Sequence, residues 1–517
     1  MCYFFRKISF VACLILLLLS ACSPSEPIYN LDKVPFIPLP STIKPSDEIL
    51  PLDAIQFIKT VGADNNLLPI AQNFKSFWKK YTQQELVISN GESNNDHAIL
   101  LEIDNDFNSN DEAYKLQIDS DEIAVKAKTV EGVFRGLKTL EQILILSYLH
   151  SKTNLKSLPG GVIIDQPGYA YRGAMLDVAR HFFSVTDIKR YIDLLSIYKI
   201  NFLHFHLSDD QGWRIEIKSW PKLTQIGGQT EVGGGQGGFY TQEDFKEIVE
   251  YAADRFITVV PEIDLPGHTN AALASYAELN CNGKATDLYT GIAVGFSTLC
   301  VDKEITYDFV EDVIREISEI SPGPYFHIGG DESHVTPQED FNRFMDRTLA
   351  IVKKYNKVPM GWYELITADI PEETLLQFWA KSGDFSKVIP KKSKILISAS
   401  SYSYLDMKYD SITPLGLNWA GYLPVKKAYD WDPRTLVPDL DTAQIIGLEA
   451  PLWSETLENF DDIALMAFPR IIGHAEIGWT DVGLRKWEDF SQRLSSHGRL
   501  LEALEVKYYQ APEIDWK

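Results

Sequence analysis

Eight short apolar runs follow one another from about residue 170 onward, and amphipathic stretches such as "TQEDFKEIVEYAADR" separate several of them. Strands that alternate with helices over roughly 300 residues predict a (β/α)8 (TIM) barrel. A doubly wound open sheet is the alternative, but no glycine-rich phosphate loop follows an early strand, which favours the barrel. The runs are "GAMLDV", "NFLHFHL", "ITVVPEID", "YFHIGG", "PMGWYE", "LLQFWA", "KILISAS" and "IIGLEAPLW".

Polar and aromatic side chains recur where each of these runs ends. The carboxyl ends of barrel strands converge on one face, where active sites lie, so we expect these residues to form a single pocket. They are Asp177, Arg180, His204, His206, Asp209, Asp210, Glu262, Asp264, His268, Asp331, Glu332, Trp362, Glu364, Trp379, Tyr404, Asp406, Trp453 and Glu455.

The chain before the barrel has a different pattern, which predicts a small α/β domain over residues 49–165. "ELVIS" and "AILLEI" are typical of strands, and "EAYKLQID" with "EIAVKA" predicts a hairpin. "VEGVFRGLKTLEQILILSYL" has the apolar spacing of a helix. We expect the catalytic barrel to occupy residues 166–517.

The first residues have the features of an export signal. Arg6 and Lys7 precede the apolar run Ile8–Leu19, which ends in "LSAC". This resembles a bacterial lipoprotein signal peptide over residues 1–21, with lipid attachment to Cys22; a plain secretory signal and an uncleaved anchor are the alternatives. Residues 22–48 are rich in proline and predict a tether. We therefore expect an exported protein, bound to a bacterial membrane only through its lipid anchor.

Two further cysteines agree with export. Cys281 and Cys300 either form a disulfide in an oxidising compartment, which we favour, or are two buried thiols, and neither has the CxxC spacing of a metal site. The net charge of −23 argues against nucleic acid and anionic membrane surfaces as partners.

Acids, aromatics and an arginine without a cofactor fingerprint favour carbohydrate chemistry. Ordinary glycosidases place two carboxyls on opposite sides of the scissile bond, about 5–5.5 Å or 6.5–9.5 Å apart. Asp331 and Glu332 are neighbours in the chain, so they do not suit that arrangement. We expect one acid and a neighbour that supports another nucleophile. The alternative is a helix N-cap with a first-turn acid.

Six ordered motifs carry a resemblance to a known family. The stretch that begins "YRGAMLDVARHFF" is followed by "VVPEIDLPGH", "HIGGDE", "GWYE", "YLD" and "APLWSE". Together they resemble the family 20 glycoside hydrolases, the β-N-acetylhexosaminidases, from about residue 110 to about 490. The segment before the barrel is similar to the small α/β domain of that family.

The resemblance implies a retaining, substrate-assisted reaction in which the 2-acetamido oxygen of the substrate attacks the anomeric carbon. Glu332 would protonate the leaving oxygen and then activate water. Asp331 would accept a hydrogen bond from the acetamide N–H and stabilise the oxazolinium-type intermediate. Tyr404 would donate a hydrogen bond to the acetamide oxygen.

The resemblance also implies how the sugar is held. The walls around the acetamide would be aromatic, the hydroxyls at the non-reducing end would meet charged groups in an exo-acting pocket, and a carboxylate–imidazole pair would tune the acid. The walls are Trp362, Trp379 and Trp453, the hydroxyl-binding groups are Arg180, Asp406 and Glu455, and the tuning pair is Asp209 with His268.

Four features of the sequence have alternative interpretations. We interpret His204 and His206 as barrel packing with at most one facing inward, the alternative being a metal pair; no metal or cofactor is implied. Arg180 has the alternative of a structural ion pair with Asp177. Tyr363 departs from the family pattern, which leaves the leaving-group preference open. The expected activity is release of terminal N-acetylhexosamine, and the alternatives are a non-catalytic glycan-binding lipoprotein and a disaccharide-releasing or transglycosylating relative.

Overall fold

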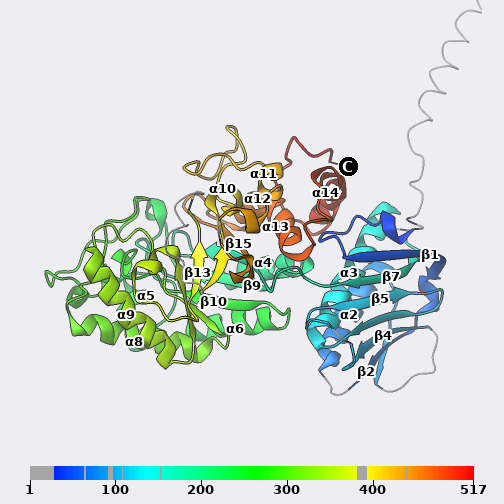
Figure 1. Ribbon diagram of the computed structural model, residues 1–517, viewed down its shortest axis with the longest axis horizontal. Coiled ribbons are helices and arrows are strands. Elements are labelled where there is room, and N and C mark those ends of the chain that lie inside the picture. Colours follow the sequence, from blue (N-terminus) through cyan, green and yellow to red (C-terminus); the bar gives the residue numbers. More distant parts are fainter. Residues whose placement is uncertain are drawn as a thin grey trace, which may run out of the picture. The chain divides into compact units, whose positions relative to one another are not determined.

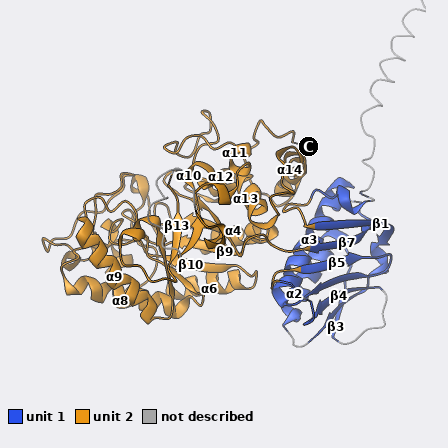
Figure 2. Ribbon diagram, viewed as in Figure 1, with its two compact units in different colours: residues 1–35, 42–109, 114–164 blue, residues 36–41, 110–113, 165–517 orange. Residues whose placement is uncertain are grey.

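The computed structural model describes residues 28, 30–62, 66–90, 97–107, 109–151, 154–380, 393–437 and 440–516. The chain divides into two compact units (Figures 1 and 2). One comprises residues up to 35, 42–109 and 114–164, and the other comprises residues 36–41, 110–113 and 165–517. The predicted signal peptide and Cys22 lie outside the described residues.

The first unit contains a seven-stranded sheet in the order β1-β7-β5-β6-β4-β2-β3. The predicted hairpin is confirmed, because β5 and β6 pair antiparallel and both alternate between buried and half-buried residues. Helix α3 begins after Thr129, whose side chain accepts a hydrogen bond from the Gly132 N–H. The strands are β1 (Thr42–Pro51), β2 (Phe57–Val61), β3 (Val87–Asn90), β4 (Ala98–Ile103), β5 (Tyr114–Ile118), β6 (Ile123–Ala127) and β7 (Ser157–Asp165), and the helices are α2 (Leu67–Thr82) and α3 (Val130–His150).

The tether predicted for residues 22–48 is too long. A short 3-10 helix, η1 (Leu31–Lys33), and strand β1 from Thr42 lie within it. Leu31, Phe36 and Ile37 are buried. These apolar side chains stand between the prolines, and their burial outweighs the prolines' preference for extended, solvated chain.

The second unit is built on a closed barrel of eight parallel strands, as predicted (Figure 1). The last strand closes it against the first, in register from Gly447 beside Tyr171 to Leu452 beside Leu176. The strands are β8 (Tyr171–Asp177), β9 (Phe202–His206), β10 (Thr258–Glu262), β11 (Tyr325–His327), β12 (Val358–Trp362), β13 (Leu375–Phe378), β14 (Lys394–Ile397) and β15 (Ile445–Leu452).

Helices follow most of these strands, and two of them begin with a capping box. Ser184 and Asp187 exchange hydrogen bonds at the start of α4, as do Thr241 and Asp244 at the start of α6. The α-helices of this unit are α4 (Val185–Ile197), α5 (Lys222–Gln225), α6 (Gln242–Ala253), α7 (Asn270–Ser275), α8 (Glu304–Ile320), α9 (Gln338–Lys354), α10 (Ser400–Ser403), α11 (Val425–Tyr429), α12 (Phe460–Ala467), α13 (Arg470–Trp479) and α14 (Trp487–Ala503). Short 3-10 helices in the two units are η2 (Leu52–Ala54), η3 (Val232–Gly234), η4 (Ala277–Leu279), η5 (Tyr363–Thr367), η6 (Pro433–Thr435) and η7 (Thr442–Gln444).

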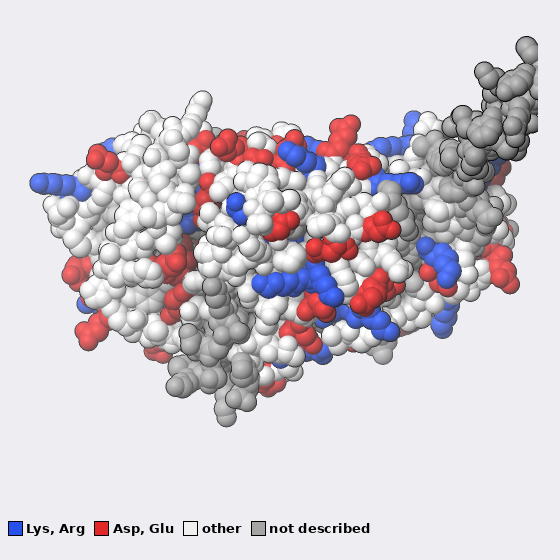
Figure 3. All heavy atoms as spheres, turned by 90° about the horizontal axis from the view of Figure 1, so that it is seen from above, with Lys and Arg blue, Asp and Glu red and all other residues white. Residues whose placement is uncertain are grey.

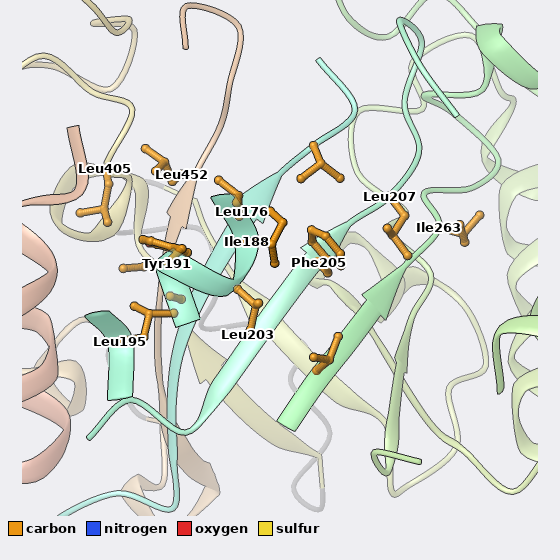
Figure 4. Close-up of a cluster of buried hydrophobic side chains, with 14 of the residues drawn as sticks. Leu176, Ile188, Tyr191, Leu195, Leu203, Phe205, Leu207, Ile263, Leu405 and Leu452 are labelled. Atoms are coloured by element: carbon orange, nitrogen blue, oxygen red, sulfur yellow. The ribbon is translucent and has the colours of Figure 1, made fainter. Parts of the chain in front are cut away.

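The core between the barrel and its helices is apolar, and Figure 4 shows its part around α4. Ile188 and Leu195 of α4 lie in one buried cluster with Leu203 and Phe205 of β9. Burying each such aliphatic side chain contributes about 1.5–3 kcal/mol. Because side chains alternate along a strand, the residues between them on β9 point into the barrel.

Cys281 and Cys300 form a disulfide, which decides between the two alternatives drawn from the sequence. On the face shown in Figure 3, basic and acidic side chains are interspersed. In the described part of the chain, no helix combines the length and the apolar character needed to cross a bilayer.

Candidate active site

The two adjacent acids follow strand β11 across a glycine pair. Gly329 and Gly330 have φ values of 65° and 102°, and a Cβ atom on Gly329 would lie 1.8 Å from Oδ1 of Asp264. Only glycine fits this close approach. Glu332 itself has a φ of 47°, in the left-handed region that costs energy for a residue with a side chain. The backbone therefore turns sharply to present both acids at the strand end.

The two acids differ in their surroundings. The side chain of Asp331 is 10% exposed and that of Glu332 is 31% exposed. Oδ1 of Asp331 is buried and has no hydrogen-bond partner among the described residues. Burial and the neighbouring Asp331 carboxylate raise the pKa of Glu332, and nearby His268 partly opposes them. Glu332 is thereby suited to hold a proton, and Asp331 to accept a hydrogen bond.

Asp209 and His268 lie together beside these acids, as the sequence predicts. His268 Nδ1 is 3.1 Å from Asp209 Oδ1, and its Nε2 is 3.7 Å from Glu332 Oε2 and 3.9 Å from Asp331 Oδ2. Burial lowers the pKa of His268, but the carboxylates of Asp209 and Asp264 outweigh it and hold that pKa well above 6.5. A cationic imidazole therefore faces the proposed acid.

Arg180 makes the ion pair with Asp177 that was the alternative role considered for it from sequence. Its guanidinium lies 2.8 Å from Asp209 and 3.4 Å from Asp177, and it stacks over the Trp453 ring at 4.8 Å. Its buried Nε has no partner among the described residues. The ion pairs fix the guanidinium, and the unpartnered Nε leaves a donor for a ligand.

The predicted aromatic walls meet in one cluster. Trp362 and Trp453 have ring centroids 6.0 Å apart, and Tyr404 lies 6.3 Å from Trp453. Trp362, Trp453 and Tyr404 are all less than 10% exposed, and half-buried Trp379 packs against the same cluster. Burial raises the pKa of the Tyr404 hydroxyl well above 10, so it remains a hydrogen-bond donor.

Asp406 is buried and Glu455 is half-buried, and both carboxylates have open acceptors. Both carboxylate oxygens of Asp406, and Oε2 of Glu455, lack a hydrogen-bond partner among the described residues. Burial raises the pKa of both groups, and for Asp406 the Glu455 carboxylate adds to it. Unpartnered buried acceptors are costly, so their presence points to hydroxyl donors from a ligand.

One residue of this site, Trp419, was not predicted from the sequence, and another, Glu364, was placed in the pocket without a role. Trp419 is 46% exposed and lies edge-on to Trp379 and Tyr404, with ring centroids 6.1 and 5.8 Å away. It stands in a long loop after β14, where no strand end marks it. Glu364 accepts a hydrogen bond from Trp379 Nε1 at 3.2 Å. The end of the motif "GWYE" places Glu364 in the expected pocket, and the structure adds its contact with Trp379.

The expectation that at most one of His204 and His206 faces inward is wrong. Residues two apart on a strand share a face, and both imidazoles are buried in the barrel against Glu262. His204, Glu262 and His327 offer ligand atoms within 4.8 Å of one another, as a metal site would require. His204 and His327 each also contact the Glu262 carboxylate directly, and such contacts agree with the packing interpretation.

Comparison with known proteins identifies the family. The model for the glycosyl hydrolase family 20 catalytic domain matches residues 169–482, and the model for domain 2 of that family matches residues 33–166. The chain belongs to glycoside hydrolase family 20.

Relatives of this family 20 chain cover most of its length. It is 41% identical to a β-N-acetylhexosaminidase of Cellulomonas fimi over 397 residues, which is 76% of this chain and 79% of that protein. The structure of the β-N-acetylhexosaminidase from Streptomyces coelicolor A3(2) superposes with a TM-score of 0.87 at 43% identity, over 94% of this chain and 99% of that one. The structure of a mutant β-hexosaminidase of Streptomyces plicatus, solved with its product GlcNAc, superposes with a TM-score of 0.88 at 41% identity, over 96% of this chain and 100% of that one.

Proposed function

We propose that the protein is an exo-acting β-N-acetylhexosaminidase, which hydrolyses terminal non-reducing N-acetyl-D-hexosamine residues by a retaining, substrate-assisted reaction. The observation that carries this proposal is the division between the two adjacent acids. Asp331 has a buried, unpartnered Oδ1, while Glu332 is more exposed, has a raised pKa and faces His268. Family membership and the relatives named above support the same substrate class.

In the first step the acetamide carbonyl oxygen bonds to the anomeric carbon as the glycosidic bond breaks. Glu332 gives its proton to the departing oxygen, so the leaving group departs as a neutral alcohol. Asp331 accepts the acetamide N–H and stabilises the positive charge that develops on the oxazolinium ring. Tyr404 donates to the acetamide oxygen and orients it for attack.

In the second step Glu332, now ionised, takes a proton from water as that water attacks the anomeric carbon. The bond to the acetamide oxygen breaks, the acetamide is restored, and the β configuration is retained. His268 faces the Glu332 carboxylate during this step. Its positive charge stabilises the ionised state on which the second step depends.

Exo action follows from the depth of the hydroxyl-binding groups. Both carboxylate oxygens of Asp406 and Oε2 of Glu455 are buried, whereas the side chain of Glu332 is 31% exposed. The sugar would enter with its non-reducing end first, since those carboxylates accept its hydroxyls beyond the acid. The leaving group would then remain on the solvent side of Glu332.

Hydrolysis of chromogenic β-N-acetylglucosaminides and galactosaminides tests the activity. We expect turnover in the range of about pH 4–8 where an acid with a raised pKa operates. No turnover of either substrate by the wild type across that range would contradict the proposed enzymatic activity and favour the non-catalytic glycan-binding alternative. Proton NMR of the first product formed should show the β anomer. A glycosyl adduct on a carboxylate of the enzyme would contradict substrate assistance.

The product pattern from chito-oligosaccharides tests exo action. Monosaccharide should appear first, with each oligomer shortened by one unit at a time. Release of disaccharide, or formation of longer oligomers, would instead indicate the disaccharide-releasing or transglycosylating alternatives. Asp331→Asn is the variant matched to the wild type in these assays. It keeps the side-chain size and loses the charge that the oxazolinium ion requires.

We also propose that the protein is exported and anchored to the membrane through a lipid on Cys22. The apolar run that ends in "LSAC" supports this, and the disulfide between Cys281 and Cys300 is typical of an oxidising compartment. Metabolic labelling with radioactive palmitate should label the wild-type protein and not Cys22→Ser. An unlabelled wild type would contradict the anchor.

A further inference from the structure

One buried carboxylate beneath the pocket contacts four ring nitrogens. Glu262, the last residue of β10, lies 3.0 Å from His204 Nε2, 2.8 Å from His327 Nδ1 and 3.0 Å from Trp362 Nε1, and it also contacts His206 Nδ1. Its side chain is 0% exposed. Two of these contacts, to the His206 ring and to the Trp362 indole N–H, are hydrogen bonds.

Two of these contacts lead directly to the reaction site. The indole N–H of Trp362, a wall of the aromatic cluster, donates to Glu262. On the other side, His206 Nε2 lies 2.9 Å from Asp209 Oδ2, and Asp209 holds His268, which faces Glu332. Glu262 thus connects the acetamide pocket and the Asp209–His268 pair through one side chain.

The charge of His206 determines which groups donate hydrogen bonds in this connection. The two ring nitrogens of His206 face the carboxylates of Glu262 and Asp209. Burial lowers the pKa of His206, but the Glu262 carboxylate and the hydrogen bonds to both acids raise it to about 10. The other charged groups that face it are Asp177 and Arg180, whose Nη1 lies 3.4 Å from Nε2. The imidazolium form therefore donates one N–H to each carboxylate.

We infer that Glu262 is a positioning residue for the reaction: it fixes the Trp362 indole and, through His206, the Asp209–His268 pair. Its contacts are to those side chains, and it acts on substrate only through them. The inference rests on the proposed function, since it assigns Glu262 to the acetamide pocket and the acid of that reaction. Within the barrel, Glu262 would set two parts of the site at once.

Glu449 of β15 offers a matched control. It is equally buried and accepts hydrogen bonds from Tyr171 at 2.9 Å and Gln377 at 2.7 Å, with His204 Nδ1 at 2.9 Å. His204 also contacts Glu262, but none of the three partners is a wall of the aromatic cluster or a member of the Asp209–His268 pair. A change at Glu449 should therefore cost stability in the same way as one at Glu262 without disturbing the reaction site.

The experiment compares Glu262→Gln with Glu449→Gln in the full-length protein. Thermal unfolding measures the stability loss, and steady-state kinetics on an aryl β-N-acetylglucosaminide give kcat, KM and their pH dependence. We expect Glu262→Gln to lose about 10- to 100-fold in kcat/KM, because small displacements of catalytic groups carry such costs. Its pH profile should gain an ionisation near the ordinary histidine pKa of about 6.5 or below. Glu449→Gln should keep the wild-type profile, and Glu262→Asp should restore part of the activity.

His206→Gln separates the contact of Glu262 with Trp362 from its connection to the Asp209–His268 pair. This variant remains informative where Glu262→Gln does not fold. It should lower kcat and leave KM near the wild-type value, because Trp362 keeps its hydrogen bond to Glu262. Imidazole NMR, assigned with this variant, provides a readout that needs no turnover. The His206 signals should titrate within an accessible pH range in Glu262→Gln and not in the wild type.

Two results would overturn the inference. One is an equal effect of Glu262→Gln and Glu449→Gln on kcat/KM with unchanged pH profiles, which is what a purely structural role gives. The other is a His206 titration that Glu262→Gln does not alter. An inactive wild type would contradict the proposed activity instead, and the NMR comparison would still decide whether Glu262 holds the His206 charge.

Discussion

His268 Nε2 lies 3.7 Å from Oε2 of Glu332, so the proposed acid stands opposite a cation that Asp209 maintains. The pKa of Glu332 is therefore set by opposing effects. Burial and Asp331 raise it, and His268 lowers it. Substitutions that change the charge of His268 should move the pH dependence of activity in a direction fixed by this geometry.

Asp209→Asn tests that direction. Without this carboxylate the pKa of His268 should fall, because burial is then opposed by fewer acids, and the positive charge that faces Glu332 should weaken. The pKa of Glu332 should then rise, so the alkaline limb of kcat/KM should move to higher pH. The value of kcat should fall, because the second step needs Glu332 ionised. Asp210→Asn, at the adjacent acid, is the control, and an alkaline limb that stays in place or moves to lower pH would contradict the prediction.

Glu332→Gln should abolish general acid catalysis. We expect kcat to fall by about 10²–10⁴ with a poor leaving group such as a sugar, and by less with a nitrophenolate, which departs without a proton. The two substrates are compared on the same preparation, with thermal unfolding as the check on folding. Added azide should not restore activity through an enzyme-bound ester. Equal losses with both substrates would argue against a proton-donating role.

Trp419→Ala should affect long substrates more than short ones. The ring is half-exposed beside Trp379 and Tyr404, where it can pack on the part of a substrate that extends toward solvent. Loss of one aromatic contact should raise KM for chito-oligosaccharides by about 3- to 10-fold. The KM for an aryl monosaccharide should change little. Tyr422→Ala, an exposed aromatic of the same loop, is the control.

Glu364→Gln should change how stability depends on pH. Burial and then Asp331 raise the pKa of Glu364 to about 8, against 4.5 for an ordinary glutamate. Between these values the folded protein keeps a proton that the unfolded chain releases, so the free energy of unfolding falls as pH rises. Glutamine removes this contribution and still accepts the Trp379 N–H. The melting temperature of the variant relative to wild type should therefore increase from about pH 5 to about pH 8.

Removal of the disulfide should destabilise the barrel unit. Substituting both Cys281 and Cys300 by serine frees a loop whose closure is worth about 3 kcal/mol. The midpoint of urea unfolding should fall, and a reductant should lower the wild-type midpoint without affecting the double variant. A reductant that leaves the wild type unchanged while the double variant is destabilised would mean that the serines, rather than the lost bond, cause the effect.

Much of this architecture could be predicted from sequence because it follows a topological rule. Strand ends in a parallel barrel share one face, so Asp177, Asp209, His268 and Glu332 could be brought together without knowledge of any distance. Their predicted roles remain to be tested by the substitutions above.

Other features depend on packing that sequence periodicity does not express. Trp419 stands in a loop, and its place beside Trp379 follows from tertiary contacts alone. The inward orientation of both His204 and His206 follows from strand periodicity, and the expectation of one inward residue misapplied it. The predicted tether is too long, because the burial of Phe36 and Ile37 outweighs the preference of the neighbouring prolines for extended chain.

The pairing of β15 with β8 has a consequence for biosynthesis. A ribosome delivers Arg180 long before Trp453, which stacks against it, and Glu455. Until β15 has emerged, the barrel remains an open sheet with two unpaired edges, prone to association with other chains. The sugar pocket is thus assembled only when nearly the whole polypeptide is available. A nascent or truncated product that ends before Ile445 would contain both acids and yet have no walled pocket in which to use them.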